Sequence, residues 1–251
     1  MELGLESRTA LVTGASAGIG RRIAAALAGE GVTVVGAARR VDLIEDLAAR
    51  TGPASGAVLP VRYDLREAGA QQDLARRAAE LAGPIDILVN VVGGYRRLEP
   101  AAPTSAWDDA MFLNFGGTRV LTELVLPSMR ERGWGRVISL AGSFEPPAMS
   151  GLSAAKAAVA AWSKSLSRVV GPDGVTVNCI QPGRIHSEQV ARLFPTAADE
   201  AAEIVRSDIP LRRFGEPEEV AGVAVFLASA AASYISGAVV PVDGGLRRYA
   251  F

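Results

Sequence analysis

The sequence contains little cysteine, histidine and lysine. Its 251 residues include one cysteine, Cys179, and one histidine, His186. A single cysteine excludes an internal disulfide, and together these two residues argue against a zinc site built from nitrogen and sulfur ligands. The only lysines are Lys156 and Lys164, and all other basic residues are arginine. A lysine retained in such an arginine-rich chain indicates a position that needs a compact ammonium group.

The sequence also lacks an excess of one charge and a long apolar run. Its 26 basic and 27 acidic residues give a formal net charge of −1, which offers no field to attract nucleic acid or an anionic membrane. The longest apolar stretch, residues 220–228, is too short to span a bilayer. Glu2 and Glu6 carry the wrong charge for a signal peptide. We therefore expect a soluble, cytoplasmic protein without nucleic-acid or membrane partners.

Short β-branched apolar runs alternate with longer segments of helical periodicity, and 49% of the residues are hydrophobic. This alternation predicts an α/β fold, a single doubly wound Rossmann-type domain over residues 1–251 with a seven-stranded, mainly parallel sheet and helices on both faces. In such sheets ligands bind beyond the carboxyl ends of the strands. The predicted strands are residues 9–12, 32–36, 57–61, 85–90, 136–140, 175–180 and 238–242, and the predicted helices are residues 18–28, 43–49, 71–81, 105–131, 152–170 and 217–228.

A glycine-rich turn joins the first predicted strand to the first predicted helix. Glycines at this place permit a tight turn and allow backbone amides to approach a pyrophosphate at the positive end of the helix. Position after the first strand of an alternating chain favours a dinucleotide site over an ordinary turn. The candidate cofactor-binding residues of this turn are Gly14, Ser16, Gly18, Ile19 and Gly20.

The end of the second predicted strand carries Arg39 and Arg40, and no carboxylate that would grip a ribose 2′-hydroxyl. Guanidinium groups suit a 2′-phosphate. Both arginines could also be ordinary surface charges, but the missing carboxylate argues independently for the phosphate. The sequence therefore predicts NADP(H) rather than NAD(H) as the cofactor.

Further motifs follow the glycine-rich turn in order: Asp64-Leu65, Asn90-Val91-Val92-Gly93, Asn114, Lys156, Pro182-Gly183 and the closing Ser236-Gly237…Val242-Asp243-Gly244-Gly245. With these motifs the chain resembles the short-chain dehydrogenase/reductase family over essentially its whole length. The resemblance implies that Asp64 contacts adenine and that the loop after Asn90 supports the ribose. It also implies that the segment after the sixth predicted strand holds the nicotinamide carboxamide, with Ser187 in place of the family's usual threonine. The further cofactor-binding residues implied in this way are Asp64, Leu65, Asn90, Gly93, Lys156, Pro182, Gly183, Ile185 and Ser187.

The family's catalytic set consists of asparagine, serine, tyrosine and lysine, with the tyrosine four residues before the lysine. Asn114 and Lys156 match this set, but Leu152 occupies the position of the tyrosine. The family serine falls on Gly142, and a shifted alignment gives its role to Ser143. Ser139 is the weaker choice because the pattern places it inside the sheet. The ordinary proton donor of the family is therefore missing.

Three groups are candidates to replace this donor: Tyr95 beyond the fourth strand, Ser143 acting through a water, and His186 in the nicotinamide loop. Each also has a plainer interpretation as a loop residue. Alternatively, the substrate is a protonated imine, which needs little acid catalysis. Arg96, Arg97 and Arg184 near the predicted pocket mouth would suit an acidic substrate, or are solvated loop charges.

The first hypothesis is thus an NADP(H)-dependent oxidoreductase for a small carbonyl, alcohol or imine substrate. A nucleotide-binding sensor or inactive subunit, and a non-redox lyase or isomerase, remain alternatives. The resemblance also implies a homo-oligomer, a dimer or tetramer formed through the helices at 105–131 and 152–170. Trp162, Leu166 and Val169 form an apolar stripe on the second of these, which core burial would also explain. The aromatic tail, residues 246–251, would meet a neighbouring subunit.

Overall fold

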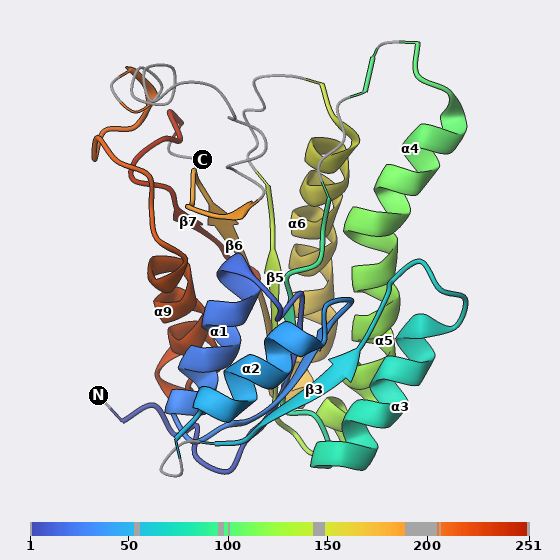
Figure 1. Cartoon of the computed structure of the whole chain (residues 1–251), viewed down its shortest axis with the longest axis vertical. Coiled ribbons are helices and arrows are strands. Elements are labelled where there is room, and N and C mark those ends of the chain that lie inside the picture. The colour runs from blue at the N-terminus through green and yellow to red at the C-terminus, as the bar shows by residue number, and fades with distance from the viewer. Residues whose placement is uncertain are drawn as a thin grey trace.

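The protein is described by a computed structural model that covers residues 2–52, 56–94, 98–99, 101–142, 149–188, 205 and 207–249. A seven-stranded sheet in the order β3-β2-β1-β4-β5-β6-β7 runs through its centre, and every neighbouring pair of strands is parallel (Figure 1). The predicted α/β fold with a doubly wound sheet is confirmed. The strands are β1 (Thr9–Thr13), β2 (Thr33–Ala38), β3 (Val58–Arg62), β4 (Ile87–Asn90), β5 (Gly135–Leu140), β6 (Val175–Pro182) and β7 (Val239–Val242).

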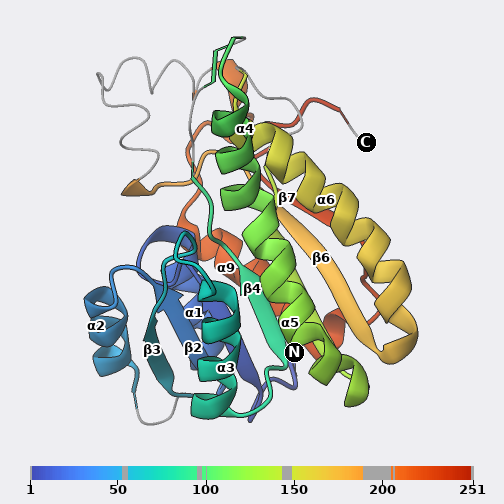
Figure 2. The same ribbon diagram turned by 90° about the vertical axis from the view of Figure 1, so that its right-hand side faces the viewer.

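Helices cover both faces of this sheet, as Figure 2 shows from the side. Helices α1, α2 and α9 pack on one face, whereas α3, α5 and α6 pack on the other. Their bounds are α1 (Gly18–Gly29), α2 (Asp42–Arg50), α3 (Ala70–Ala82), α4 (Thr104–Met111), α5 (Gly117–Glu131), α6 (Gly151–Val170) and α9 (Pro217–Ala228). Each predicted strand and helix is present, and its ends differ from the prediction by at most two residues, with one exception.

The exception is the predicted helix at residues 105–131, which the structure divides. Helix α4 is followed by one turn of π-helix, Phe112–Gly116, before α5 begins. The apolar periodicity continues through both helices, so it could not reveal the extra residue in the turn. A π-turn widens the helix locally and often marks a functional site. Here it contains Asn114.

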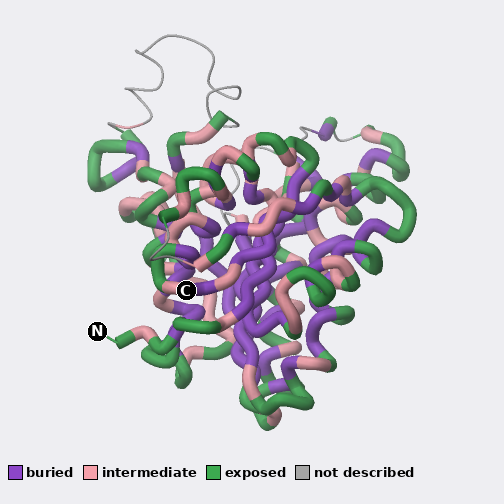
Figure 3. Tube along the Cα trace, turned by 60° about the horizontal axis from the view of Figure 1, so that its bottom comes forward, coloured by how far each residue is buried: buried purple, intermediate pink, exposed green. Residues whose placement is uncertain are grey.

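The core consists of two apolar layers, because successive side chains of a strand point to opposite faces of the sheet. Val12 and Val34 face α1 and α9, while their neighbours Leu11 and Val35 face α3 and α5. The central strands β1, β4 and β5 are buried along their whole length, and Figure 3 shows this buried centre beneath an exposed rim. A rigid sheet thus fixes the positions of the loops at its carboxyl edge.

The strand order reverses between β1 and β4, since β2 and β3 lie on one side of β1 and the later strands lie on the other. The loops that leave β1 and β4 therefore diverge and open a crevice at the carboxyl edge of the sheet. Among the described residues, no helix has both the length and the apolar character of a membrane span.

Candidate functional site

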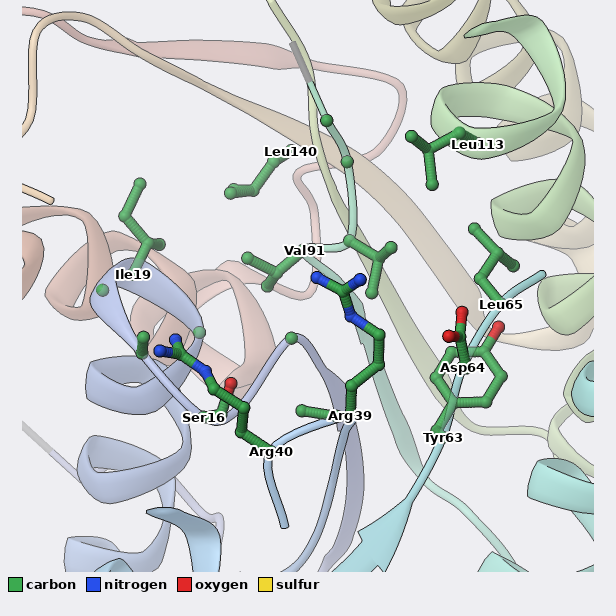
Figure 4. A pocket seen from close by; sticks show the side chains of 18 of the residues that line it. Ser16, Ile19, Arg39, Arg40, Tyr63, Asp64, Leu65, Val91, Leu113 and Leu140 are labelled. Carbon is green, nitrogen blue, oxygen red and sulfur yellow. The ribbon is translucent and has the colours of Figure 1, made fainter. Parts of the chain in front are cut away.

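A cavity of about 840 Å³ occupies the carboxyl edge of the sheet at this reversal point. This is the size of a cofactor site. The sequence-predicted residues that line it come from the loops after β1, β2, β3, β4 and β6, and Figure 4 shows part of this lining. They are Gly14, Ser16, Gly18, Ile19, Gly20, Arg39, Arg40, Asp64, Leu65, Gly93 and Ser187.

The glycine-rich turn places the open end of α1 against the cavity. Gly18 begins the helix with φ of +51°, a left-handed conformation that a side chain would strain. A Cβ atom on Gly20 would collide with the carbonyl oxygen of Gly14, so the turn closes only around glycine. Within the part of the chain that the structure describes, no side chain caps the helix, and its first turn contains no acidic residue. Its free N–H groups and positive dipole end suit a pyrophosphate.

The loops after β2 and β3 form the adjoining wall. Figure 4 shows the guanidinium groups of Arg39 and Arg40 over the cavity, with Arg40 on the side of Ser16 and Arg39 on the side of Val91. Asp64 accepts a hydrogen bond from the backbone N–H of Arg66 at 3.1 Å, which fixes the turn after β3. Two exposed cations on this wall of the cavity suit an anionic phosphate better than a neutral hydroxyl group.

The loop after β4 is tied to β1 by the hydroxyl of Thr13. This oxygen accepts hydrogen bonds from the N–H groups of Val91 at 3.0 Å and Val92 at 3.4 Å. Asn90 is buried instead of lining the cavity, and its Nδ2 donates to Thr122 at 3.2 Å and to Ser139 at 3.3 Å. Asn90 therefore holds β4 to α5 and β5, while the residues after it form the cavity wall.

Asn114 and Lys156 meet behind Gly93. The Asn114 side chain accepts from the Gly94 N–H at 2.9 Å and donates to the carbonyl oxygens of Gly94 and Ala110. It thus joins the π-turn to the loop after β4. A Cβ atom on Gly93 would lie 2.8 Å from Asn114 Oδ1 and 3.5 Å from Lys156 Nζ, so both side chains lie directly behind this part of the cavity wall.

Lys156 is a buried cation, with 5% of its surface exposed. Its Nζ donates a hydrogen bond to the Val92 carbonyl at 3.4 Å, which leaves further donors on the ammonium group. Burial lowers the pKa of Lys156 to about 8, and the nearby Cys179 opposes this shift. The lysine is therefore mostly charged at neutral pH but is held there at a cost in desolvation.

Several predicted residues lie elsewhere. The segment at the end of β6 contacts β7 and Gly215 through Pro182, Gly183 and Ile185. Among the described residues, these three are not part of the lining of the large cavity. Exposed His186 lies 3.8 Å from Glu216, with its ring centre 5.3 Å from that of Phe214, also outside this lining. Arg184 lines a second, smaller cavity. Tyr95, Arg96, Arg97 and Ser143 lie outside the described residues.

Several residues that line or support the cavity are not among those predicted from the sequence, and Thr13 and Glu188 show why. Thr13 ends a buried strand, and a hydroxyl at such a place indicates a hydrogen-bonding role. Glu188 lines the cavity and pairs with Arg40, 148 positions earlier in the chain. The sequence shows that Glu188 and Arg40 have opposite charges, but only the fold brings the two residues together.

Comparison with known proteins places this site in a family. A family model described as enoyl-(acyl carrier protein) reductase matches residues 14–247. A 3-oxoacyl-[acyl-carrier-protein] reductase FabG of Aquifex aeolicus is 33% identical over 98% of this chain and 100% of its own. A D-threitol dehydrogenase of Mycolicibacterium smegmatis is 36% identical over 96% of this chain and 93% of its own.

A solved structure of an acyl-carrier-protein reductase is also similar to this chain. The crystal structure of a 3-oxoacyl (acyl-carrier-protein) reductase from Agrobacterium tumefaciens with NADP bound superimposes with a TM-score of 0.90. It is 33% identical and covers 96% of this chain and 94% of its own. The likeness therefore extends over the sheet, the helices and the loops that surround the cavity.

Proposed function

The chain belongs to the short-chain dehydrogenase/reductase family and is an NAD(P)-dependent oxidoreductase of that family, and we propose that it uses NADP(H). The proposed substrate is a small carbonyl, alcohol or imine, and the proposed proton donor is a group other than the family's tyrosine. The observation that carries this proposal is the cavity at the carboxyl edge, where the open end of α1 and the two arginines after β2 lie together. The NADP that the similar crystal structure contains supports the same choice.

The residues present fit a dinucleotide. The uncapped start of α1 would hold the pyrophosphate, Asp64 and Leu65 would border the adenine, and Arg39 would pair with the 2′-phosphate. Lys156 would donate to the ribose hydroxyls near the nicotinamide, since its ammonium group has donors beyond the one used by Val92. When bound, the nicotinamide supplies or accepts the hydride.

Proton transfer is the step in which this chain must differ from family members that use the tyrosine. A carbonyl that accepts hydride at carbon becomes an alkoxide at oxygen and needs a proton there, and a positioned general acid contributes roughly 10²–10⁴ in rate. Leu152, on the first turn of α6 and one turn before Lys156, has no proton to give. A protonated imine already carries its proton and becomes a neutral amine, so it needs no acid. We therefore place imines beside carbonyls among the candidate substrates, and keep Tyr95, Ser143 and His186 as candidate donors.

The proposal is tested by titrating the protein with NADPH and NADH and then following NADPH oxidation with a panel of ketones, aldehydes and imines. We expect tighter binding of NADPH, turnover of some panel members, and faster ketone reduction in Leu152→Tyr than in wild type by about 10-fold or more. Leu152→Phe is the matched control, because it adds the same ring without the hydroxyl.

Three results would contradict the proposal. Equal or tighter binding of NADH would remove the cofactor preference. Tight NADPH binding without turnover in the wild type would favour a sensor or an inactive subunit. An equal increase in ketone reduction by Leu152→Tyr and Leu152→Phe would mean that the gain comes from the aromatic ring and that the missing tyrosine hydroxyl does not limit the rate.

A further inference from the structure

Arg40 and Glu188 form an ion pair across the large cavity. Arg40 follows β2, whereas Glu188 lies beyond β6 on the segment that carries Ser187, and both residues line the cavity. Arg40 Nη1 lies 3.1 Å from Oε2 of Glu188 and donates to its Oε1 at 3.3 Å. About half of each side chain is exposed, 47% for Arg40 and 51% for Glu188. A carboxylate thus already engages one of the two cations proposed to receive a phosphate.

Arg39 differs from Arg40 in this respect. Within the described residues, its side chain makes no hydrogen bond or ion pair, although Figure 4 shows it over the same cavity. A 2′-phosphate entering beside β2 would meet one available guanidinium group and one that is paired with Glu188. The phosphate and the carboxylate are both negative, so they compete for Arg40 and repel each other.

We propose that Glu188 is a specificity-determining residue, which competes with the 2′-phosphate of NADP(H) for Arg40 and so narrows the preference for NADP(H) over NAD(H). This inference rests on the proposed use of NADP(H) through the arginines after β2. NADH carries a neutral hydroxyl at the same ribose position and leaves the Arg40–Glu188 pair intact. Glu188 therefore lowers the affinity for one cofactor without lowering it for the other.

The test compares dissociation constants for NADPH and NADH, measured by titration of the full chain, in wild type and Glu188→Gln. Because an exposed ion pair contributes little, we expect NADPH to bind about two- to fivefold more tightly to the variant, and NADH to bind as before. Glu67→Gln is the matched control. Glu67 pairs with Arg62 at 2.9 Å and is similarly exposed, but neither residue lines the cavity. The Glu67→Gln substitution should change the dissociation constant of neither NADPH nor NADH.

A double-mutant cycle with Arg40→Gln shows whether Glu188 acts through Arg40. We expect the gain in NADPH affinity from Glu188→Gln to be much smaller in the Arg40→Gln background. An equal gain in both backgrounds would overturn competition for Arg40. Weaker NADPH binding by Glu188→Gln, or the same change for NADH, would overturn the inference as well.

The experiment also separates this inference from the proposed function. If wild type binds NADPH no more tightly than NADH, and neither Arg39→Gln nor Arg40→Gln weakens NADPH binding, both proposals fail. If wild type prefers NADPH and Arg39→Gln weakens NADPH binding, but Glu188→Gln changes neither dissociation constant, only the inference about Glu188 fails.

Discussion

At the scale of single residues, Lys156, the proposed ribose ligand, lies in an environment that disfavours its positive charge. The side chain is buried behind the cavity wall, and among the described residues it donates a hydrogen bond to a neutral carbonyl, that of Val92. Desolvation therefore lowers its pKa from 10.5 to about 8. A lysine whose pKa is lower in the folded state destabilises the fold whenever it is charged. Such a cost is expected where a residue is retained for binding rather than for stability.

Lys156→Met should therefore stabilise the cofactor-free protein while weakening cofactor binding. Below pH 8 the charged lysine costs up to about 3 kcal/mol, and this cost falls as the pH rises from 8 to 10.5, because the unfolded chain then binds more protons than the folded one. Chemical denaturation at pH 7 and pH 10 should show a larger gain for the variant at pH 7. Exposed Lys164→Met is the control and should show no gain. A less stable Lys156→Met at pH 7 would contradict this account.

At the scale of elements, helix α1 contains two glycines with opposite roles. Gly20 lies near its start against the Gly14 carbonyl, where a Cβ atom has no room. Gly29 ends the same helix, and a Cβ there would meet no atom of the described residues within 4 Å. One glycine is required by the close approach of the turn that faces the cavity, whereas the other only adds flexibility to the unfolded chain.

Gly20→Ala should therefore weaken nucleotide binding by 10-fold or more, because the turn must open and move its amides away from the pyrophosphate. Gly29→Ala should leave binding unchanged and raise the free energy of unfolding by about 0.5–1 kcal/mol. Titration with NADPH and thermal unfolding of both variants test this pair. If Gly20→Ala binds NADPH as wild type does, the turn is not the pyrophosphate site.

At the scale of the whole molecule, large apolar side chains are exposed on the π-turn, on α5 and on α6. They are Phe112 before α5, Leu124 on α5 and Val169 on α6. Leu166 of the apolar stripe on α6 packs against the monomer core, but Val169 is 62% exposed, so core burial does not explain Val169. Trp162 of the same stripe packs edge-on against Phe115, with ring centres 6.0 Å apart. Exposed apolar side chains of this kind favour the proposed association through α5 and α6.

We predict that light scattering at micromolar concentration gives the mass of a dimer or tetramer, and that Val169→Glu lowers it. A buried charge at a two-fold interface meets its own copy, which makes the effect large. Leu81→Glu, at a 52% exposed position on α3, is the control and should keep the wild-type mass. A monomeric wild type would remove the proposed assembly.

The sequence by itself determined the order of strands and helices and the position of the glycine-rich turn, because local periodicity and glycine spacing depend on neighbouring residues. It also identified Arg39 and Arg40 at a strand end, since parallel strands bring their ends to one edge, whereas Asp64 was implied by the family resemblance. The π-turn around Asn114, the burial of Lys156 and the pairing of Arg40 with Glu188 were decided only by the tertiary structure. Each depends on which distant segments pack together, and no local pattern carries that information.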